Sequence, residues 1–111
     1  MNDCIFCKIA EGKIPSEFVY EDGQLVVFRD IYPKAPVHLL MIPRQHVAGL
    51  NDLQPEHDNL MVHMLRTLPE VARRAGLEDG YRTIINTGRG GGQEIFHLHM
   101  HILGGGQLPG F

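Results

Sequence analysis

The sequence predicts an α+β domain built on a five-stranded antiparallel sheet, with one main helix that is kinked or broken and a short N-terminal helix. Two observations support this fold class. Five short apolar stretches with strand character are mostly joined by short connections, and one longer stretch repeats its apolar residues at helical spacing. A parallel βαβ fold is disfavoured because too few helical stretches lie between the predicted strands.

The predicted strands are delimited by residues that favour turns. Glu21-Asp22-Gly23 is a turn signal between the first two strands. The proline-containing stretch 32–36 interrupts the pattern before the third strand, because proline cannot donate a hydrogen bond to a ladder, and Pro43 ends that strand. We therefore expect strands at residues 18–20, 25–30, 37–42, 81–86 and 95–103.

The main helix is predicted to follow residues 51–54, which offer capping side chains, with Pro55 in its first turn. Pro69 either kinks this helix or breaks it. In the second case a new short helix continues to Ala75 and is stopped by Gly76. Apolar residues at a spacing of four mark the buried face, namely Leu60, Met64 and Leu68, with Met61 and Leu65 beside them.

The chain length fits one domain. A chain of 111 residues can bury roughly two thirds of its unfolded surface, so a core can form without disulfides. With no linker visible, we expect a domain over residues 3–105 and a short tail over 106–111. A net charge of −3 gives no general attraction to nucleic acid, and no block of like charges marks a membrane surface. Without a signal-peptide pattern, we expect a cytoplasmic location.

Three histidines, His97, His99 and His101, occupy alternate positions in the apolar stretch 95–103. On a strand, alternate side chains point to opposite faces. We therefore expect the histidines on one face and Phe96, Leu98, Met100 and Ile102 in the core. Imidazole can ligate a metal, attack an electrophile or contact a phosphate near neutral pH. Three in register indicate a functional site more strongly than a half-exposed strand.

Cys4 and Cys7 form one C-x-x-C pair, and they are the only cysteines. In a reducing compartment this spacing favours metal or redox chemistry over a structural disulfide. A zinc site would need two more ligands, and His46, at a strand end, and His97 are candidates. A thioredoxin-like redox pair stays open, because the spacing alone does not select the histidines.

Residues 88–93 contain four glycines and directly precede the histidine stretch. Such a run can turn backbone N–H groups toward a phosphate, or it can be a flexible hairpin turn. Asp30, at the end of a predicted strand, could accept the hydroxyls of a ribose or form a turn. Asn86 has the same two interpretations.

Together these segments resemble the histidine triad (HIT) nucleotide-binding family, especially its Hint branch of nucleoside phosphoramidases. Their order and spacing agree from about Cys4 to Gly105. The triad with its preceding Gly-Gly-Gln is highly specific, whereas the C-x-x-C occurs in only some members. The segments that carry the resemblance are Cys4-Ile-Phe-Cys-Lys-Ile, Phe28-Arg-Asp-Ile, Ala35-Pro-Val-His, Ile42-Pro-Arg-Gln-His, Asn86-Thr-Gly and Gly91-Gly-Gln-Glu-Ile-Phe-His-Leu-His-Met-His-Ile-Leu-Gly-Gly.

The resemblance implies a role for each residue of the site. His99 would attack the α-phosphorus of a nucleotide and form a covalent nucleotidyl-histidine that water then hydrolyses. His101 would contact the phosphoryl oxygens, and His38 would help to relay a proton. A structural zinc ion would be held by Cys4, Cys7, His46 and His97. The nucleotide would be contacted by Phe28, Asp30, Ile31, Asn86, Gly92, Gln93, Glu94 and Ile95, together with His99 and His101.

The implied function is that of a homodimeric hydrolase of purine nucleotide conjugates such as adenosine 5′-monophosphoramidate. Three features depart from the best-known Hint proteins. Glu94 occupies a position where they have a hydroxyl residue, and Pro69 interrupts their usual long helix. The tail 106–111 is short and has no tryptophan, whereas some family tails reach toward the nucleotide pocket of the partner subunit. The Glu94 carboxylate would repel a phosphate unless only its backbone N–H faces it. Alternatives are a dinucleoside polyphosphate hydrolase, a zinc-stabilised binding module with little turnover, and a hydrolytic zinc centre on His97, His99 and His101.

Overall fold

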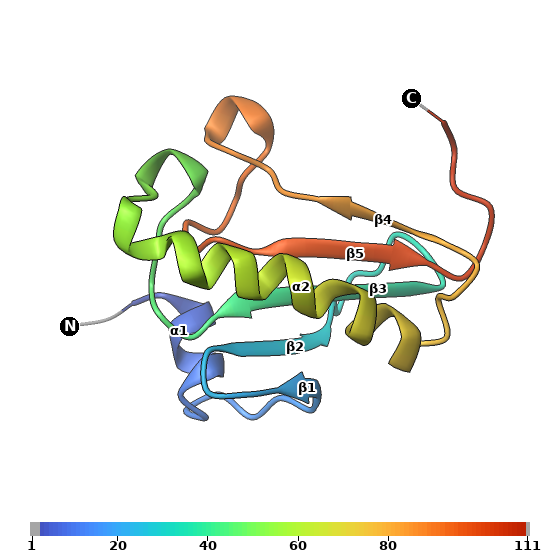
Figure 1. Ribbon diagram of the computed structural model, residues 1–111, viewed down its shortest axis with the longest axis horizontal. Helices are drawn as coiled ribbons and strands as arrows, with labels where there is room; N and C mark the ends of the chain where they lie inside the picture. Colours follow the sequence, from blue (N-terminus) through green and yellow to red (C-terminus); the bar gives the residue numbers. More distant parts are fainter. Residues whose placement is uncertain (1–2, 111) are drawn as a thin grey trace.

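The structure, a computed structural model, describes residues 3–110 and has a single antiparallel sheet at its centre (Figure 1). Its five strands lie in the order β1-β2-β3-β5-β4, so that the strand carrying His101 lies between β3 and β4. The predicted five-stranded antiparallel sheet is confirmed. The strands are β1 (Phe18–Glu21), β2 (Leu25–Arg29), β3 (Val37–Pro43), β4 (Tyr81–Ile84) and β5 (Met100–Gly104).

Two helices cover opposite faces of this sheet. The long helix α2 (Asp58–Arg74) packs on the face formed by residues such as Val27, Leu39 and Met41. The short helix α1 (Ile5–Ala10) packs on the other face, against Val26, Phe28 and their neighbours. Because both faces are covered, β2 and most of β3 read as continuous apolar runs without alternation.

The main helix is one continuous α-helix through Pro69, so the predicted break does not occur. Pro69 itself is exposed, and the carbonyl that lacks its usual N–H donor can therefore be solvated. A 3₁₀ turn at Pro55–His57 leads into the helix and carries the predicted capping interactions, while two further turns lie at Leu50–Asp52 and Arg89–Gly91. The buried face contains Leu60, Met64 and Leu68, as predicted.

The last strand differs from the prediction for residues 95–103. It begins only at Met100, so residues 95–99 do not belong to the strand. Phe96 is 46% exposed, so it does not lie in the predicted core. Leu98, Met100 and Ile102 are in the core under α2, and the rings of His97 and His99 both pack against Phe6 of α1 on the other side, so the rest of the predicted alternation holds. The physical reason is that the chain leaves the sheet here: the Leu98 N–H donates to the carbonyl of Val47 rather than to a neighbouring strand.

The other strand ends shift by one or two residues, so that Asp30 and Asn86 lie just beyond β2 and β4. The tail after β5 is held by Arg82, which donates to the Pro109 carbonyl, and Phe111 of the predicted tail lies outside the described residues. Within residues 3–110, no helix combines the length and apolar character needed to cross a membrane.

Candidate active site and metal cluster

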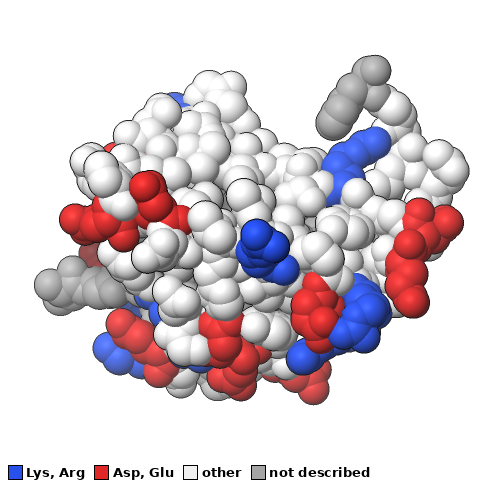
Figure 2. All heavy atoms as spheres, in the orientation of Figure 1, with Lys and Arg blue, Asp and Glu red and all other residues white. Residues whose placement is uncertain are grey.

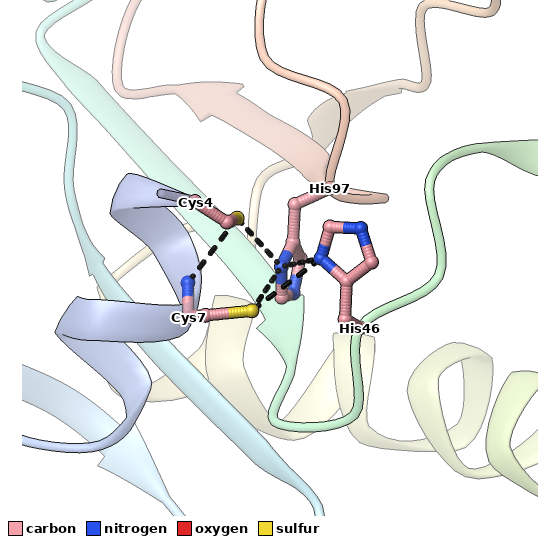
Figure 3. A group of neighbouring side chains, drawn as sticks. All are labelled: Cys4, Cys7, His46 and His97. Atoms are coloured by element: carbon pink, nitrogen blue, oxygen red, sulfur yellow. Dashed lines mark hydrogen bonds between the residues drawn. The ribbon is translucent and has the colours of Figure 1, made fainter. Parts of the chain in front are cut away.

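Four side chains from distant parts of the chain meet beside the N-terminus of α1 (Figure 3). Cys4 and Cys7 come from the start of α1, His46 follows β3, and His97 precedes β5. Their ligand atoms all lie within 4.8 Å of one another. The His97 Nδ1 atom is 3.3 Å from the Cys4 Sγ and 3.2 Å from the His46 Nδ1, and the Cys7 Sγ is 3.4 Å from the same His46 atom.

Hydrogen bonds around the cluster prepare these atoms to ligate a cation. The Nε2–H of His97 donates to the Pro43 carbonyl at 2.8 Å, so its Nδ1 lone pair points toward the two sulfurs. Burial lowers the pKa of His97, which keeps the ring neutral as ligation requires. The Cys7 N–H donates to the Cys4 Sγ at 3.4 Å, which fixes the position of this sulfur. Two sulfurs and two imidazoles fit the donor set of a tetrahedral structural zinc site.

A cavity of about 740 Å³ opens on the α1 face of the sheet, next to this cluster. It is where the residues predicted to act on a nucleotide come together, although they derive from three strands and two loops. The predicted residues that line it are Phe28, Asp30, Ile31, His38, Asn86, Gly92, Glu94, Ile95, His99 and His101.

Gln93 does not line this cavity, because its side chain is buried and bonded to the backbone. Its Nε2 donates to the carbonyls of Ala48 and Ile95 at 2.7 and 3.1 Å, and its Oε1 accepts the Gly88 N–H at 2.9 Å. A Cβ at Gly49 would lie 3.1 Å from that Oε1. Gln93 therefore fixes the shape of the glycine-rich loop, and its predicted contact with a nucleotide stays a prediction.

His99 lies between the metal cluster and the cavity and is 8% exposed. Its Nδ1–H donates to the carbonyl of His97 at 2.8 Å. The proton of the neutral ring is thus on Nδ1, and Nε2 carries the lone pair that a nucleophile needs. Phe6 packs edge-on against this ring at a centroid distance of 5.1 Å and against the His97 ring at 5.9 Å, which restricts both orientations.

His101 and His38 form a hydrogen-bonded pair. The Nδ1 of His38 accepts the Lys34 N–H at 3.1 Å, so the neutral ring carries its proton on Nε2. That atom lies 2.8 Å from the His101 Nδ1 and 3.4 Å from the Asp30 carboxylate. By donating to the His101 Nδ1, it leaves the proton of His101 on Nε2 as a donor.

The charge state of this pair follows from its surroundings. Burial and the neighbouring His99 and His38 rings lower the pKa of His101 to about 4. Burial also lowers the pKa of His38, although the Asp30 carboxylate opposes it. Both rings are therefore neutral at neutral pH, and each can donate one proton and accept another.

Comparison with known proteins agrees with this geometry. The family model described as "Scavenger mRNA decapping enzyme C-term binding" matches residues 3–108. A HIT family hydrolase from Legionella pneumophila Philadelphia 1 superposes with a TM-score of 0.93 at 46% identity, covering 96% of each chain. The chain belongs to the HIT family. It is a hydrolase of that family, as the resemblance implied.

Other relatives cover almost the whole chain. Protein HitA of Neisseria gonorrhoeae is 56% identical over 104 residues, which span 94% of this chain and 97% of the relative. The purine nucleoside phosphoramidase of Escherichia coli (strain K12) is 46% identical over 107 residues, which span 96% and 90%. A histidine triad protein from Clostridium difficile superposes with a TM-score of 0.95 at 43% identity, covering 100% and 97%.

The fold shows which histidines lie beside the two cysteines, a choice that the sequence pattern left open. Of the seven histidines, His46 and His97 meet the cysteines, while His97, His99 and His101 do not converge on one point. Two contributors were missed. Phe6 touches both His97 and His99, and its place between the two cysteines was the available signal. Lys34 acts through its main-chain N–H, for which the sequence gives no signal.

Proposed function

We propose that this HIT hydrolase cleaves the P–N bond of purine nucleoside 5′-phosphoramidates, such as adenosine 5′-monophosphoramidate, through a covalent nucleotidyl-His99. The observation that carries the proposal is the hydrogen bond from the His99 Nδ1–H to the His97 carbonyl, which leaves the Nε2 lone pair free to attack. The E. coli relative named as a purine nucleoside phosphoramidase supports the choice of substrate.

The proposed reaction has two displacements. In the first, the His99 Nε2 bonds to phosphorus, the P–N bond breaks, and the departing amine takes a proton. In the second, water attacks phosphorus and releases a proton, which replaces the one taken by the amine. The P–Nε2 bond breaks, and the products are a nucleoside monophosphate and the original imidazole. The His101 Nε2–H donates to a phosphoryl oxygen, where negative charge develops, and His38 relays protons to its Nδ1.

The proposed binding mode assigns the base, the ribose and the phosphate to different parts of the cavity. Phe28 and Ile31 border the base, and Asp30, just after β2, accepts the ribose hydroxyls. One Asp30 oxygen already accepts the Tyr32 N–H at 2.8 Å, which holds the carboxylate in place. The phosphate then lies near His99 and His101, with Asn86, Gly92, Glu94 and Ile95 on its far side.

The metal cluster is proposed to hold zinc as a structural ion. Cys4, Cys7, His46 and His97 would be its four ligands, and it would stabilise the junction of α1 with the strand ends without contacting substrate. Thiolate ligands persist in a reducing compartment, so a cytoplasmic location belongs to the same proposal.

A homodimer completes the proposed assembly. β4 is an edge strand whose outer side is unpaired among residues 3–110, and α2 exposes Val62 and Leu65. Figure 2 shows that uncharged atoms cover much of the upper half of the α2 face, while charged side chains gather along its lower and lateral edges. These features support a second copy of the chain docking on this side of the domain, which we take to span residues 3–105.

Replacing the nucleophile tests the proposed function. His99→Ala should abolish turnover of adenosine 5′-monophosphoramidate while nucleotide binding is retained. Acid quenching of the unaltered enzyme during turnover should trap a nucleotidyl adduct on His99, detected by mass spectrometry. His63→Ala is the matched control, because His63 lies on α2 and does not line the cavity.

Three results would contradict the proposal. Near-native turnover by His99→Ala would exclude the covalent mechanism. Absence of both turnover and adduct would identify a zinc-stabilised binding module. Faster cleavage of diadenosine polyphosphates than of phosphoramidates would identify the other class of hydrolase.

A further inference from the structure

One row of side chains crosses the sheet beneath the cavity. Phe28 pairs with Leu40, Leu40 with His101, and His101 with Ile84. Adjacent strands lie about 4.8 Å apart, so Phe28 lies about 10 Å from His101 on one side and Ile84 about 5 Å on the other. The cavity therefore has a β2 side and a β4 side, with the catalytic histidines between them.

In the proposed binding mode the nucleoside fills the β2 side. Phe28, Asp30 and Ile31 belong to this side, where β2 ends. A displacement at phosphorus places the attacking and leaving atoms roughly in line. The leaving group therefore departs away from His99, toward the mouth of the cavity, and the remaining wall is on the β4 side, formed by Asn86, Gly92 and Glu94.

The backbone around Glu94 is fixed on both sides. The buried Gln93 precedes it and donates to the carbonyl of Ile95, which follows it. The loop is also closed by the Asn86 Nδ2, which donates to the Gly91 carbonyl at 2.9 Å. The Glu94 side chain is exposed on the cavity wall, so its carboxylate stays hydrated at the edge of the cavity.

The charges that line the cavity are unevenly distributed. Its cationic lysine and arginine side chains, Arg29 and Lys34, lie on the β2 side or in the loop that follows it. Arg29 pairs with Glu17 at 3.9 Å, and the Lys34 Nζ donates to the Tyr32 carbonyl at 3.4 Å. No ion pair found among residues 3–110 involves Glu94.

We propose that Glu94 makes this enzyme selective for phosphoramidates whose leaving amine bears a second, positively charged group, an inference that rests on the proposed function. In this binding mode the leaving group lies on the same side of the cavity as the exposed Glu94 carboxylate. Opposite charges about 6 Å apart in a water-like medium favour a cationic group by roughly threefold, and an anionic group is disfavoured by a similar factor. Partial desolvation at the cavity mouth increases both factors.

Three matched substrates test this selectivity. They are the adenosine 5′-phosphoramidates of 1,4-diaminobutane, pentylamine and 5-aminopentanoate, which share a four-carbon spacer and end in an ammonium, a methyl and a carboxylate group. The kcat/KM values should fall in that order for the unaltered enzyme, with a cation-to-anion ratio of roughly tenfold. Glu94→Gln should bring this ratio near one, and Glu94→Lys should invert it.

Comparing the ratios between variants cancels differences in the chemical reactivity of the three amines. Glu78→Gln is the control, because Glu78 is an exposed carboxylate that does not line the cavity, and its ratio should match that of the unaltered enzyme. If a Glu94 variant does not fold, the unaltered protein can be tested at different salt concentrations. Raising the salt concentration should reduce its cation-to-anion ratio of kcat/KM. The same ratio in Glu94→Gln as in the unaltered enzyme, or a salt-independent ratio, would overturn the inference with the proposed function intact. Failure to cleave adenosine 5′-monophosphoramidate as well as these three substrates would overturn the proposed function itself.

Discussion

Main-chain groups set the tautomers of three histidines in the site. The carbonyls of His97 and Pro43 accept from His99 and His97, and the Lys34 N–H donates to His38. The sequence identifies these histidines as chemical groups, but it gives no information on which nitrogen carries the proton. That depends on backbone partners up to 54 positions away along the chain, which only the folded structure brings close.

The half-buried His101 predicts how stability depends on pH. Its pKa is about 4 in the folded protein against an ordinary 6.5, so between these values the unfolded chain binds the extra proton. The contribution is complete above about pH 6.5 and is lost as the pH falls toward 4. We expect a loss on the order of 2 kcal/mol, after allowing for partial solvent screening.

Urea unfolding at a series of pH values between 7 and 4.5 measures this effect. His101→Asn should flatten the dependence without removing it, because the pKa values of His38 and His97 are lowered too. Glu78→Gln serves as the control. A His101→Asn variant with an unchanged pH dependence would show that this ring titrates normally in the folded state.

At the scale of elements, one carboxylate joins the β1–β2 hairpin to α2. Asp22 accepts hydrogen bonds from the Gln24 and Leu25 N–H groups through one oxygen, and from Tyr20 and His63 at 2.7 Å through the other. Burial alone would raise the pKa of Asp22, but these hydrogen bonds outweigh it and lower the pKa to about 2. The turn was predicted from Glu21-Asp22-Gly23, but the contact with a helix 41 positions away was not.

Asp22→Asn should therefore destabilise the fold by about 1–3 kcal/mol, because a charge-assisted acceptor of four donors is lost. The expected result is a lower urea midpoint at neutral pH. The difference should shrink as the pH falls below about 4 toward 2, where the native carboxylate becomes protonated. The proposed phosphoramidase activity should be unchanged, since Asp22 does not line the cavity; a loss of activity in folded protein would contradict this assignment.

Helix α1 depends on its surroundings, because six residues are too few for an independently stable helix. Its buried side places Phe6 against Phe28 and the two histidine rings. Its first turn carries Cys7 of the metal cluster, with Cys4 immediately before it. A cluster that fixes α1 therefore also fixes Phe6, which restricts the orientation of the His99 ring.

Removing the proposed zinc ion should consequently lower stability first, and activity only as α1 loosens. We expect about one zinc per chain as purified, and a lower melting temperature after treatment with a strong chelator. Activity should decline in parallel with unfolding, and early addition of zinc should restore both. Immediate loss of activity with unchanged circular dichroism would instead indicate a catalytic metal.

For the whole molecule, periodicity and turn residues were sufficient to predict the strand order along the chain and the long helix, because these are local signals. They failed at residues 95–99, where a tertiary contact of Leu98 with Val47 removes the chain from the sheet. Pro69 was read as a possible break, but its exposed position allows the helix to continue. The metal cluster required the fold, since its members are spread from Cys4 to His97.

The proposed homodimer predicts that association depends on the apolar surface of α2. Leu65→Glu should weaken or abolish it, because Leu65 is 57% exposed and a buried unpaired carboxylate is unfavourable. Sedimentation equilibrium should give twice the chain mass for the unaltered protein and a lower mass for the variant. Arg66→Ala, an exposed position on the same helix, is the control. A monomer for the unaltered protein would exclude the dimer.

The bonds of Gln93 have a consequence for ligand affinity. Four glycines within six residues normally make a flexible segment. Here the buried amide of Gln93 hydrogen-bonds this segment to the neighbouring backbone. The conformational entropy of these glycines is lost when the protein folds, before any ligand binds. A ligand therefore binds to a loop that is already ordered, and its affinity is not reduced by the cost of ordering that loop.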